Sequence, residues 1–213
     1  MPMNASSLPA PLLRTIEKLK REFALIPPNR QDQLNELGHF LRTERATARR
    51  VAFTVICTHN SRRSHFGQLW LAAATRYYRL SGVESYSGGT EATAFIPRAV
   101  EALRHLGFPL QQTAISENPI YQCHWDDGTP VRDLFSKVYT APPNPRRDFA
   151  AVLVCEAAAE TCPVVVGAKA RFTLTYRDPK RFDDSPDPDR HYRECAEQIG
   201  REVLFALYPG QIA

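Results

Sequence analysis

The sequence predicts an α/β protein: a three-layer fold in which helices flank a central parallel four-stranded sheet, with a helical extension at the N-terminus. Two patterns predict it. Short β-favouring runs alternate with longer segments of helical periodicity from residue 51 to residue 207, and this alternation is typical of parallel sheets covered on both faces. The first run, 51–56, is continuously apolar, as expected for a strand buried on both faces.

Four strands and three helices are expected in this part of the chain. Pro97 and Gly107 bracket one helix, because proline fits the first helical turn and glycine suits the residue after the last. Residues 116–145 are expected to form an inserted hairpin or a long loop. In chain order, we expect strands at 51–56, 85–87, 150–154 and 172–176, and helices at 64–80, 97–106 and 188–207.

The first fifty residues are expected to form helices only. Apolar residues recur at helical spacing from Leu12 to Phe23, and the pair Pro27-Pro28 ends that helix. A second helix is predicted over 31–42.

A charged linker is expected after these helices, at 43–50. We therefore divide the chain into an N-terminal helical extension, 1–48, and a main domain, 49–213. We expect the extension to pack against the helices that flank the sheet or against a second subunit of a homodimer.

Composition restricts the class of protein. With 43% hydrophobic and 23% charged residues the chain can bury a core, and its charge sum of 27 − 23 = +4 is mildly basic. No block of like charge is long enough for a nucleic-acid tail, and no apolar run approaches a membrane span. Five cysteines are too few, and odd in number, for a secreted disulfide scaffold. We expect a cytoplasmic protein that binds neither nucleic acid nor membrane and whose cysteines carry chemistry.

A candidate site follows the first predicted strand. Cys57 and Arg63 stand six positions apart, and Ser64 opens the next helix. A loop between a strand and a helix can wrap its backbone N–H groups around a tetrahedral oxyanion, and Arg63 can fork onto two of the oxygens. The same positive field, with the partial charge of the helix N-terminus, favours a thiolate nucleophile at Cys57. The alternative is a structural cysteine beside a basic helix start.

The residues of this loop are the expected substrate-binding residues. Ser64 could donate a hydrogen bond to the thiolate, and Asn60 tolerates the left-handed backbone that a tight loop needs. The expected oxyanion-binding residues are Thr58, His59, Asn60, Ser61, Arg62, Arg63 and Ser64.

The loop also resembles that of a known family. Residues 56–64, Ile-Cys-Thr-His-Asn-Ser-Arg-Arg-Ser, look like the phosphate loop of the low-molecular-weight protein tyrosine phosphatase superfamily, in particular its thioredoxin-coupled arsenate reductase branch, which typically reads V-C-T-G-N-S-C-R-S. The resemblance continues within 86–103 and covers roughly 50–208. His59 replaces a glycine of that pattern, and Arg62 replaces the cysteine that protects the nucleophile in the phosphatases.

Cys155 and Cys162 form a second group, seven positions apart after a predicted strand. Their spacing is similar to that of the redox pair of the reductase branch. The resemblance implies that Cys57 attacks arsenate, that Cys155 attacks Cys57 and releases arsenite, and that Cys162 then moves the disulfide onto itself and Cys155. It implies no bound cofactor, and an external thioredoxin as the reductant.

Two other interpretations of these cysteines stay open. Ordinary packing accounts for a buried cysteine at the end of an apolar strand. A structural zinc site would need His191 and Cys195, spaced i, i+4 on the last predicted helix, to join Cys155 and Cys162. The chain has no close C-x2-C pair to support zinc, so no metal is expected.

An Asp-Pro pair follows the last predicted strand. In the superfamily that the chain resembles, such a loop carries the general acid, and Asp178 is the matching residue. It would protonate the leaving oxygen. Asp183 and Asp184 are the alternative acids, and a simple turn is the structural alternative.

These observations favour a cysteine-dependent oxyanion enzyme, with arsenate, phosphate or sulfate in the loop and arsenate reduction as the reaction. The Cys155/Cys162 pair separates it from a low-molecular-weight protein tyrosine phosphatase, which hydrolyses phosphomonoesters through a phosphocysteine. The segment after Asp178 also lacks the tyrosines that such phosphatases commonly carry there. A phosphate-sensing module without catalysis is the third hypothesis, and the presence of Cys57, Arg63 and Asp178 together argues against it.

Overall fold

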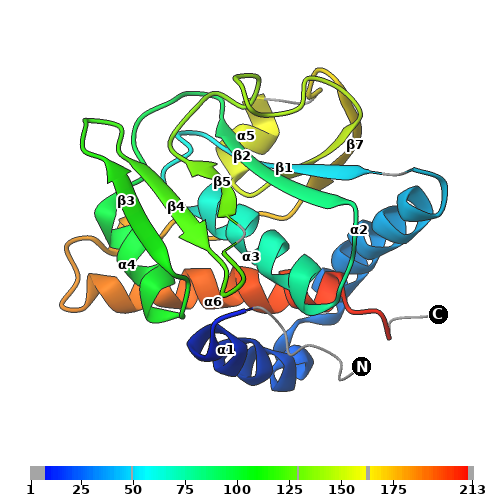
Figure 1. Cartoon of the computed structure of the whole chain (residues 1–213), viewed down its shortest axis with the longest axis horizontal. Coiled ribbons are helices and arrows are strands. Elements are labelled where there is room, and N and C mark those ends of the chain that lie inside the picture. Colours follow the sequence, from blue (N-terminus) through cyan, green and yellow to red (C-terminus); the bar gives the residue numbers. More distant parts are fainter. Residues whose placement is uncertain (1–7, 49, 129, 162–163, 211–213) are drawn as a thin grey trace.

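A four-stranded parallel sheet forms the centre of the computed structural model, which describes residues 8–48, 50–128, 130–161 and 164–210. The strand order is β2-β1-β6-β7, and every neighbouring pair is parallel, which confirms the predicted fold class (Figure 1). The strands are β1 (Val51–Cys57), β2 (Val83–Gly89), β6 (Phe149–Leu153) and β7 (Ala168–Thr173). β1 is buried along its whole length, as its continuous apolar run predicted.

Helices α3 and α6 lie along one side of the sheet, and the short helix α5 lies on the other (Figure 1). Gly67 lets α3 approach the sheet, because a Cβ there would lie 2.8 Å from Cγ1 of Val55. The helices of the main domain are α3 (Arg63–Tyr77), α4 (Pro97–His105), α5 (Glu156–Thr161) and α6 (Pro188–Ala206), and a 3-10 turn, η2, spans Pro179–Phe182. No helix within the described ranges combines the length and apolarity needed to cross a lipid bilayer.

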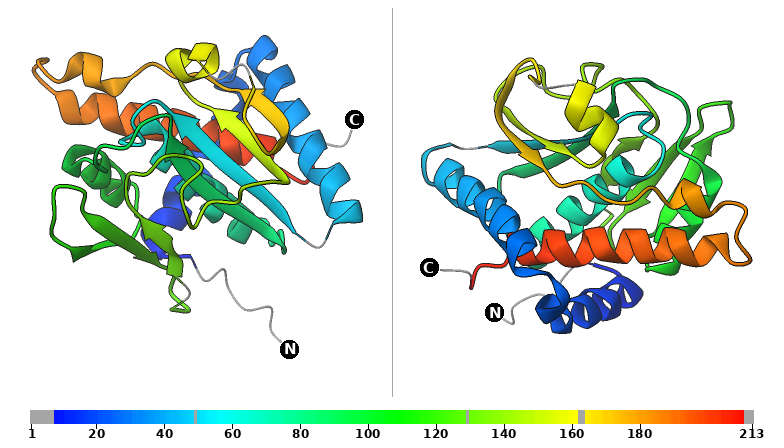
Figure 2. Two further views of the ribbon diagram at one scale, coloured as in Figure 1. Left: turned by 90° about the horizontal axis from the view of Figure 1, so that it is seen from above. Right: turned by 180° about the vertical axis from the view of Figure 1, so that it is seen from behind.

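The N-terminal helices pack on α6. Helix α1 (Ala10–Arg21) buries Leu12, Ile16 and Leu19 and lies along α6, while α2 crosses near the C-terminal end of α6 (Figure 2). A 3-10 turn, η1 (Phe23–Leu25), connects α1 to α2 (Pro28–Thr47). The extension thus packs on a helix that flanks the sheet, the first of the two expected arrangements.

The predicted linker at 43–50 is wrong over residues 43–47, because α2 continues to Thr47. Glu44, Arg45 and Ala46 are all good helix formers, and Glu44 pairs with Lys169 of β7 at 2.6 Å. The charges therefore lie on a helix that reaches the edge strand of the sheet.

A three-stranded antiparallel sheet stands beside the main sheet, and its last two strands form the hairpin that was one of the two expectations for 116–145. Its order is β3-β4-β5, formed by β3 (Leu110–Ala114), β4 (Ile120–His124) and β5 (Pro130–Leu134). The sequence did not predict β3, because Leu110 is its only buried residue. After β5 the chain returns to the main sheet, where Val138 forms a bridge with Gly89.

The last strand of the main sheet was predicted at 172–176 and lies at Ala168–Thr173. β7 is an edge strand in which half-buried and exposed residues alternate. Its half-buried residues are Ala168, Ala170 and Phe172. This weak apolar signal explains the error. The displacement leaves residues 174–178 as an extended connection that runs past the end of the sheet to η2.

Candidate active site

The loop between β1 and α3 encloses the sulfur of Cys57. β1 ends at Cys57 and α3 begins at Arg63, so five residues make the connection. The loop turns at Asn60, which has a φ of 48° and whose backbone N–H donates to Cys57 Sγ at 3.2 Å. The expected left-handed position is thus Asn60. The neighbouring His59, which replaces a glycine of the family pattern, directs its ring toward Glu91 at 3.8 Å.

A second donor reaches the sulfur through a chain of side chains. Asn60 Nδ2 donates to Ser64 Oγ at 2.8 Å, and Ser64 Oγ lies 3.1 Å from Cys57 Sγ. Either Ser64 or Cys57 can donate in this contact, but a thiolate carries no proton, so the hydroxyl is the donor once Cys57 is ionised. Asn60 and Ser64 are both fully buried. Cys57 therefore faces two hydrogen-bond donors, which is the environment that stabilises a thiolate.

Side chains from other parts of the chain form hydrogen bonds with two backbone carbonyl groups of the loop. His59 O accepts from the hydroxyls of Thr93 at 3.1 Å and Ser136 at 2.9 Å, and Asn60 O is 3.0 Å from His65 Nε2. Burial lowers the pKa of His65 well below its ordinary value, and the charge of Lys137 adds to this effect. These contacts fix the loop, whose residues line a small hollow beside Cys57.

The segment after β5 completes this support. The Lys137 backbone N–H donates to Asn60 Oδ1 at 2.9 Å, and the Ser136 hydroxyl holds His59 O. Sequence reasoning did not find Ser136, and it considered Lys137 only as a positive charge near the mouth of the site, not as a residue that holds the loop. They stand 77 positions from their partners, in a segment without a recognisable pattern.

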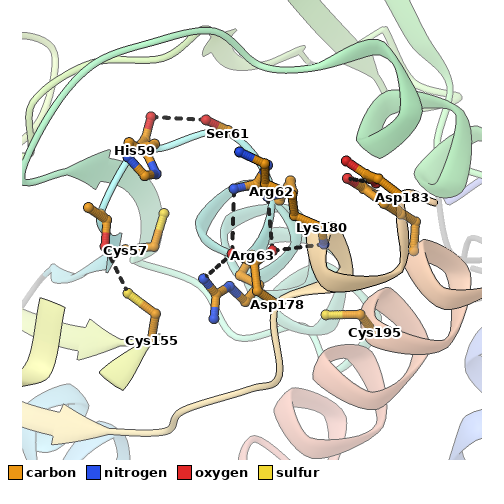
Figure 3. Close-up of polar contacts among 12 residues, drawn as sticks. Cys57, His59, Ser61, Arg62, Arg63, Cys155, Asp178, Lys180, Asp183 and Cys195 are labelled. Atoms are coloured by element: carbon orange, nitrogen blue, oxygen red, sulfur yellow. Dashed lines mark hydrogen bonds and ion pairs between the residues drawn. The ribbon is translucent and has the colours of Figure 1, made fainter. Parts of the chain in front are cut away.

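Asp178 lies at the mouth of the loop, bound by two arginines (Figure 3). Arg63 Nη2 is 2.6 Å from Asp178 Oδ2, and Arg62 Nε is 3.1 Å from Asp178 Oδ1. Arg63 Nη1 also donates to the backbone oxygen of Tyr176 at 2.7 Å. Arg62, which replaces a cysteine of the family pattern, is thus a partner of the candidate acid.

The alternative acids lie farther along the chain, in the turn after η2. Asp183 accepts from Arg98 at 3.0 Å and from the hydroxyl of Tyr192 at 2.9 Å, and Asp184 follows it in that turn. Of Asp178 and Asp183, only Asp178 is bonded to the arginines of the loop.

Cys155 and the loop line the same cleft. This cleft has a volume of about 650 Å³. Cys155 follows β6, and its Sγ lies 3.4 Å from the hydroxyl of Thr58, the residue after Cys57. The Ala158 N–H in α5 donates to Cys155 Sγ at 3.4 Å. The rim carries exposed Arg177, Lys180 and Arg181. Cys162 lies outside the described residues.

The zinc alternative requires Cys162, which lies outside the described residues, and two of its other members contact different partners. His191 stacks on Phe182 with ring centroids 3.9 Å apart, and Cys195 donates to the backbone oxygen of Arg177 at 3.7 Å. Within the described part of the chain, no group of three or more His, Cys, Asp and Glu side chains could hold a metal ion.

A cysteine enclosed by a strand–loop–helix turn, with a guanidinium and a carboxylate at its mouth, defines a candidate cysteine-dependent oxyanion site. No protein-family model and no curated protein match the sequence. Among solved structures, Primo-1 matches with a TM-score of 0.50 at 12% identity, over 76% of this chain and 99% of that one.

Two further solved structures match this chain. A low-molecular-weight phosphotyrosine phosphatase from Vibrio cholerae O395 has a TM-score of 0.49 at 14% identity, over 73% of this chain and 93% of that one. An arsenate reductase in its phosphate-binding state has a TM-score of 0.45 at 14% identity, over 72% of this chain and 93% of that one. At such identities a likeness concerns the fold alone. The likeness to Primo-1 concerns the α/β fold, and the family resemblance of the loop stays a prediction.

Proposed function

We propose that the protein is a cysteine-dependent oxyanion enzyme that reduces arsenate, with Cys57 as the nucleophile and Cys155 as the second thiol. The observation that carries this proposal is the position of Cys155. Its sulfur lies on the wall of the cleft onto which the Cys57 loop opens, 3.4 Å from the hydroxyl of Thr58.

In the first step the Cys57 thiolate attacks the arsenic atom, and one arsenate oxygen leaves as water. The loop amides and Arg63 hold the remaining oxygens, and Asp178 supplies the proton to the leaving oxygen. Arg63 is bound to Asp178 and to Tyr176 O in the described state, so it exchanges these partners for the anion when arsenate enters.

In the second step Cys155 attacks Cys57 Sγ. A Cys57–Cys155 disulfide forms, the sulfur–arsenic bond breaks, and its electron pair stays on arsenic, which leaves as arsenite. Cys162 then attacks Cys155 and frees Cys57. An external dithiol of the thioredoxin class reduces the Cys155–Cys162 disulfide, and no bound cofactor takes part. The Ala158 N–H that points at Cys155 Sγ supports the thiolate in these exchanges.

Phosphomonoester hydrolysis is the second candidate, and the placement of Asp178 favours it. The carboxyl group of Asp178 lies at the mouth of the loop, where its protonated form can protonate an ester oxygen and the resulting carboxylate can then activate water. The rim offers cationic side chains, and the tyrosine of the cleft lining, Tyr176, is buried, so an acidic phosphorylated ligand suits the cleft better than a phenyl ring.

The decisive experiment compares two reactions in one set of variants. The protein is incubated with arsenate, thioredoxin, thioredoxin reductase and NADPH, and in parallel with p-nitrophenyl phosphate. We expect NADPH oxidation that depends on arsenate and is lost in C57S, C155S and C162S. In C162S one arsenite is released per chain, and mass spectrometry finds a Cys57–Cys155 disulfide.

Cys195→Ala is the matched control, because this thiol lies outside the cleft lining. It should keep full turnover. If C155S and C162S reduce arsenate as fast as the unsubstituted protein, the reductase proposal is wrong. Ester hydrolysis that only C57S and D178N impair would identify the phosphatase instead.

A further inference from the structure

Arg30 in the N-terminal extension reaches the connection between β7 and η2. It lies in the first turn of α2, and its guanidinium makes three contacts outside this helix, besides one to Gln33 within it at 2.9 Å. Arg30 Nε is 2.7 Å from Oε2 of Glu202 in α6, and Arg30 Nη2 donates to Thr175 O at 3.2 Å. The same group lies over the ring of Tyr176, 4.8 Å from its centroid.

This cluster is buried. The side chain of Glu202 is 3% exposed and that of Arg30 is 14% exposed, and Tyr176 is 6% exposed. Burial raises the pKa of the Tyr176 hydroxyl well above its ordinary value, and the charge of Glu202 adds to the effect. A buried, forked guanidinium with partners on three sides has little freedom to move, so it fixes the backbone that it holds.

The residues held by Arg30 are direct neighbours of the site. Tyr176 O accepts from Arg63 at 2.7 Å, and Asp178 stands two residues farther along. The connection is also tied to the sheet by the Tyr176 N–H, which donates to Val154 O at 3.2 Å, next to Cys155. One short segment therefore has Arg30 on one side and Arg63 on the other.

We propose, on the basis of the function proposed above, that Arg30 is a positioning residue that fixes residues 175–178 and thereby sets Asp178 and Arg63 at the Cys57 loop. The N-terminal extension then contributes to the reaction, because α2 places the Arg30 guanidinium against residues 175–178, which include Asp178. Lysine cannot replace it, since a single ammonium group on a flexible stem lacks the planar fork that meets Glu202, Thr175 O and the Tyr176 ring together.

The test uses three variants of the full chain. Arg30→Met alone would leave Glu202 buried without its partner, so the double variant R30M/E202Q removes the guanidinium and that charge together. Arg30→Lys keeps a positive charge beside Glu202. Glu44→Gln is the matched control, because it breaks another ion pair between α2 and the main domain, to Lys169, away from the cleft lining.

Three quantities are measured: kcat and KM in whichever of the two reactions the unsubstituted protein catalyses, the protection of Cys57 from iodoacetamide by arsenate, and hydrogen exchange of the amides at 174–178. In R30M/E202Q we expect kcat to fall on the order of tenfold, because a small displacement of the acid is costly. Arsenate protection should change by less than about twofold, since the loop amides stay in place and Arg63, the first residue of α3, can still reach the anion. Exchange at 174–178 should become faster.

Arg30→Lys separates positioning from simple charge pairing. We expect its melting temperature to stay near that of the unsubstituted protein while its kcat remains low, and we expect E44Q to match the unsubstituted protein in all three quantities. Full kcat in R30K or in R30M/E202Q, or unchanged exchange at 174–178, would overturn the proposal. If the unsubstituted protein catalyses neither reaction, the proposed function fails, and the exchange measurement alone decides whether Arg30 holds the segment.

Discussion

Two pairs of cysteines in this molecule are equally buried and differ in their surroundings. Cys57 and Cys155 lie at the carboxyl edge of the parallel sheet and are 4% and 3% exposed. Cys123 in β4 and Cys195 in α6 are 0% and 8% exposed. Depth of burial therefore does not distinguish the pair at the cleft from the pair in the surrounding elements.

Hydrogen-bond donors do distinguish them. Cys57 Sγ meets the Asn60 N–H and the Ser64 hydroxyl, and Cys155 Sγ accepts from the Ala158 N–H. Burial instead raises the pKa of Cys123 to about 12, and that of Cys195 also to about 12. A buried sulfur without donors stays a neutral thiol at physiological pH, whereas a buried sulfur with donors can become a nucleophile.

The largest expected effect follows from replacing the sulfur that has two donors. Cys57→Ser should lower turnover by about 10⁴-fold or more, because the reaction loses its nucleophile while the loop keeps its hydrogen bonds. Cys123→Ala removes a sulfur of equal burial and should leave turnover unchanged. Initial rates, corrected for the folded fraction from circular dichroism, provide the measurement. Comparable losses in the two variants would refute the distinction between the pairs.

Asn60 supplies one of the two donors to Cys57 and bonds Ser64, which supplies the other, so its replacement should affect stability as well as rate. Asn60→Ala leaves Ser64 Oγ and the Lys137 N–H without their buried partner and places a Cβ residue at a φ of 48°. We expect the free energy of unfolding to fall by about 3–4 kcal/mol in urea titrations.

Asn60→Gly is the matched variant, because glycine accepts the backbone angle but restores neither hydrogen bond. It should recover about 1 kcal/mol relative to alanine. If N60A is as stable as the unsubstituted protein, the buried network does not hold the loop.

The sequence allowed most of the fold and the centre of the site to be predicted. The helices beginning at Pro97 and Pro188 lie as expected, because proline at their first turn and an apolar face define them locally. The loop from Cys57 to Arg63 could be predicted for a similar reason, since its nucleophile, turn residue and arginine are neighbours in the chain.

The rest of the site depends on contacts between distant segments. Arg30 and Thr175 are 145 positions apart, and Ser136 and His59 are 77 apart. A lone arginine in a polar helix and a lone serine in a loop carry no local pattern, so their roles exist only in the folded chain. β3 was missed for a related reason, because its one buried residue gives no strand periodicity.

Burial also shifts the pKa of a basic group, the side chain of Lys137. Burial lowers its pKa to about 8, with Asp133 opposing the shift. Between about pH 8 and its unfolded pKa near 10.5, the unfolded chain keeps a proton that the folded protein has released, so the stability contributed by this group rises with pH in that window.

In Lys137→Met this titrating group is absent, so its contribution to the pH dependence of the free energy of unfolding is lost. We expect the difference between K137M and the unsubstituted protein to change by about 2–3 kcal/mol from pH 7 to pH 10, in favour of the unsubstituted protein at the higher pH. Urea titrations at pH 7, 8, 9 and 10 measure it. A difference that is constant over this range would show that Lys137 keeps its proton, and that burial does not govern its charge.

The smallest effect is expected at Cys195, which tests whether nearby arginines are enough to make a reactive thiol. Figure 3 shows Cys195 close to Asp178, and the charges of Arg63 and Arg62 act to lower its pKa, yet burial prevails. Its thiol donates to Arg177 O and so serves as a donor, the reverse of Cys57. Cys195→Ala should therefore cost about 1 kcal/mol of stability from lost packing and leave turnover within about twofold. Iodoacetamide at pH 8 should label Cys57 and spare Cys195, as peptide mass spectrometry would reveal. Rapid labelling of Cys195 in the folded protein would mean that the positive charges around a sulfur, rather than the donors that touch it, decide which thiol of this molecule reacts.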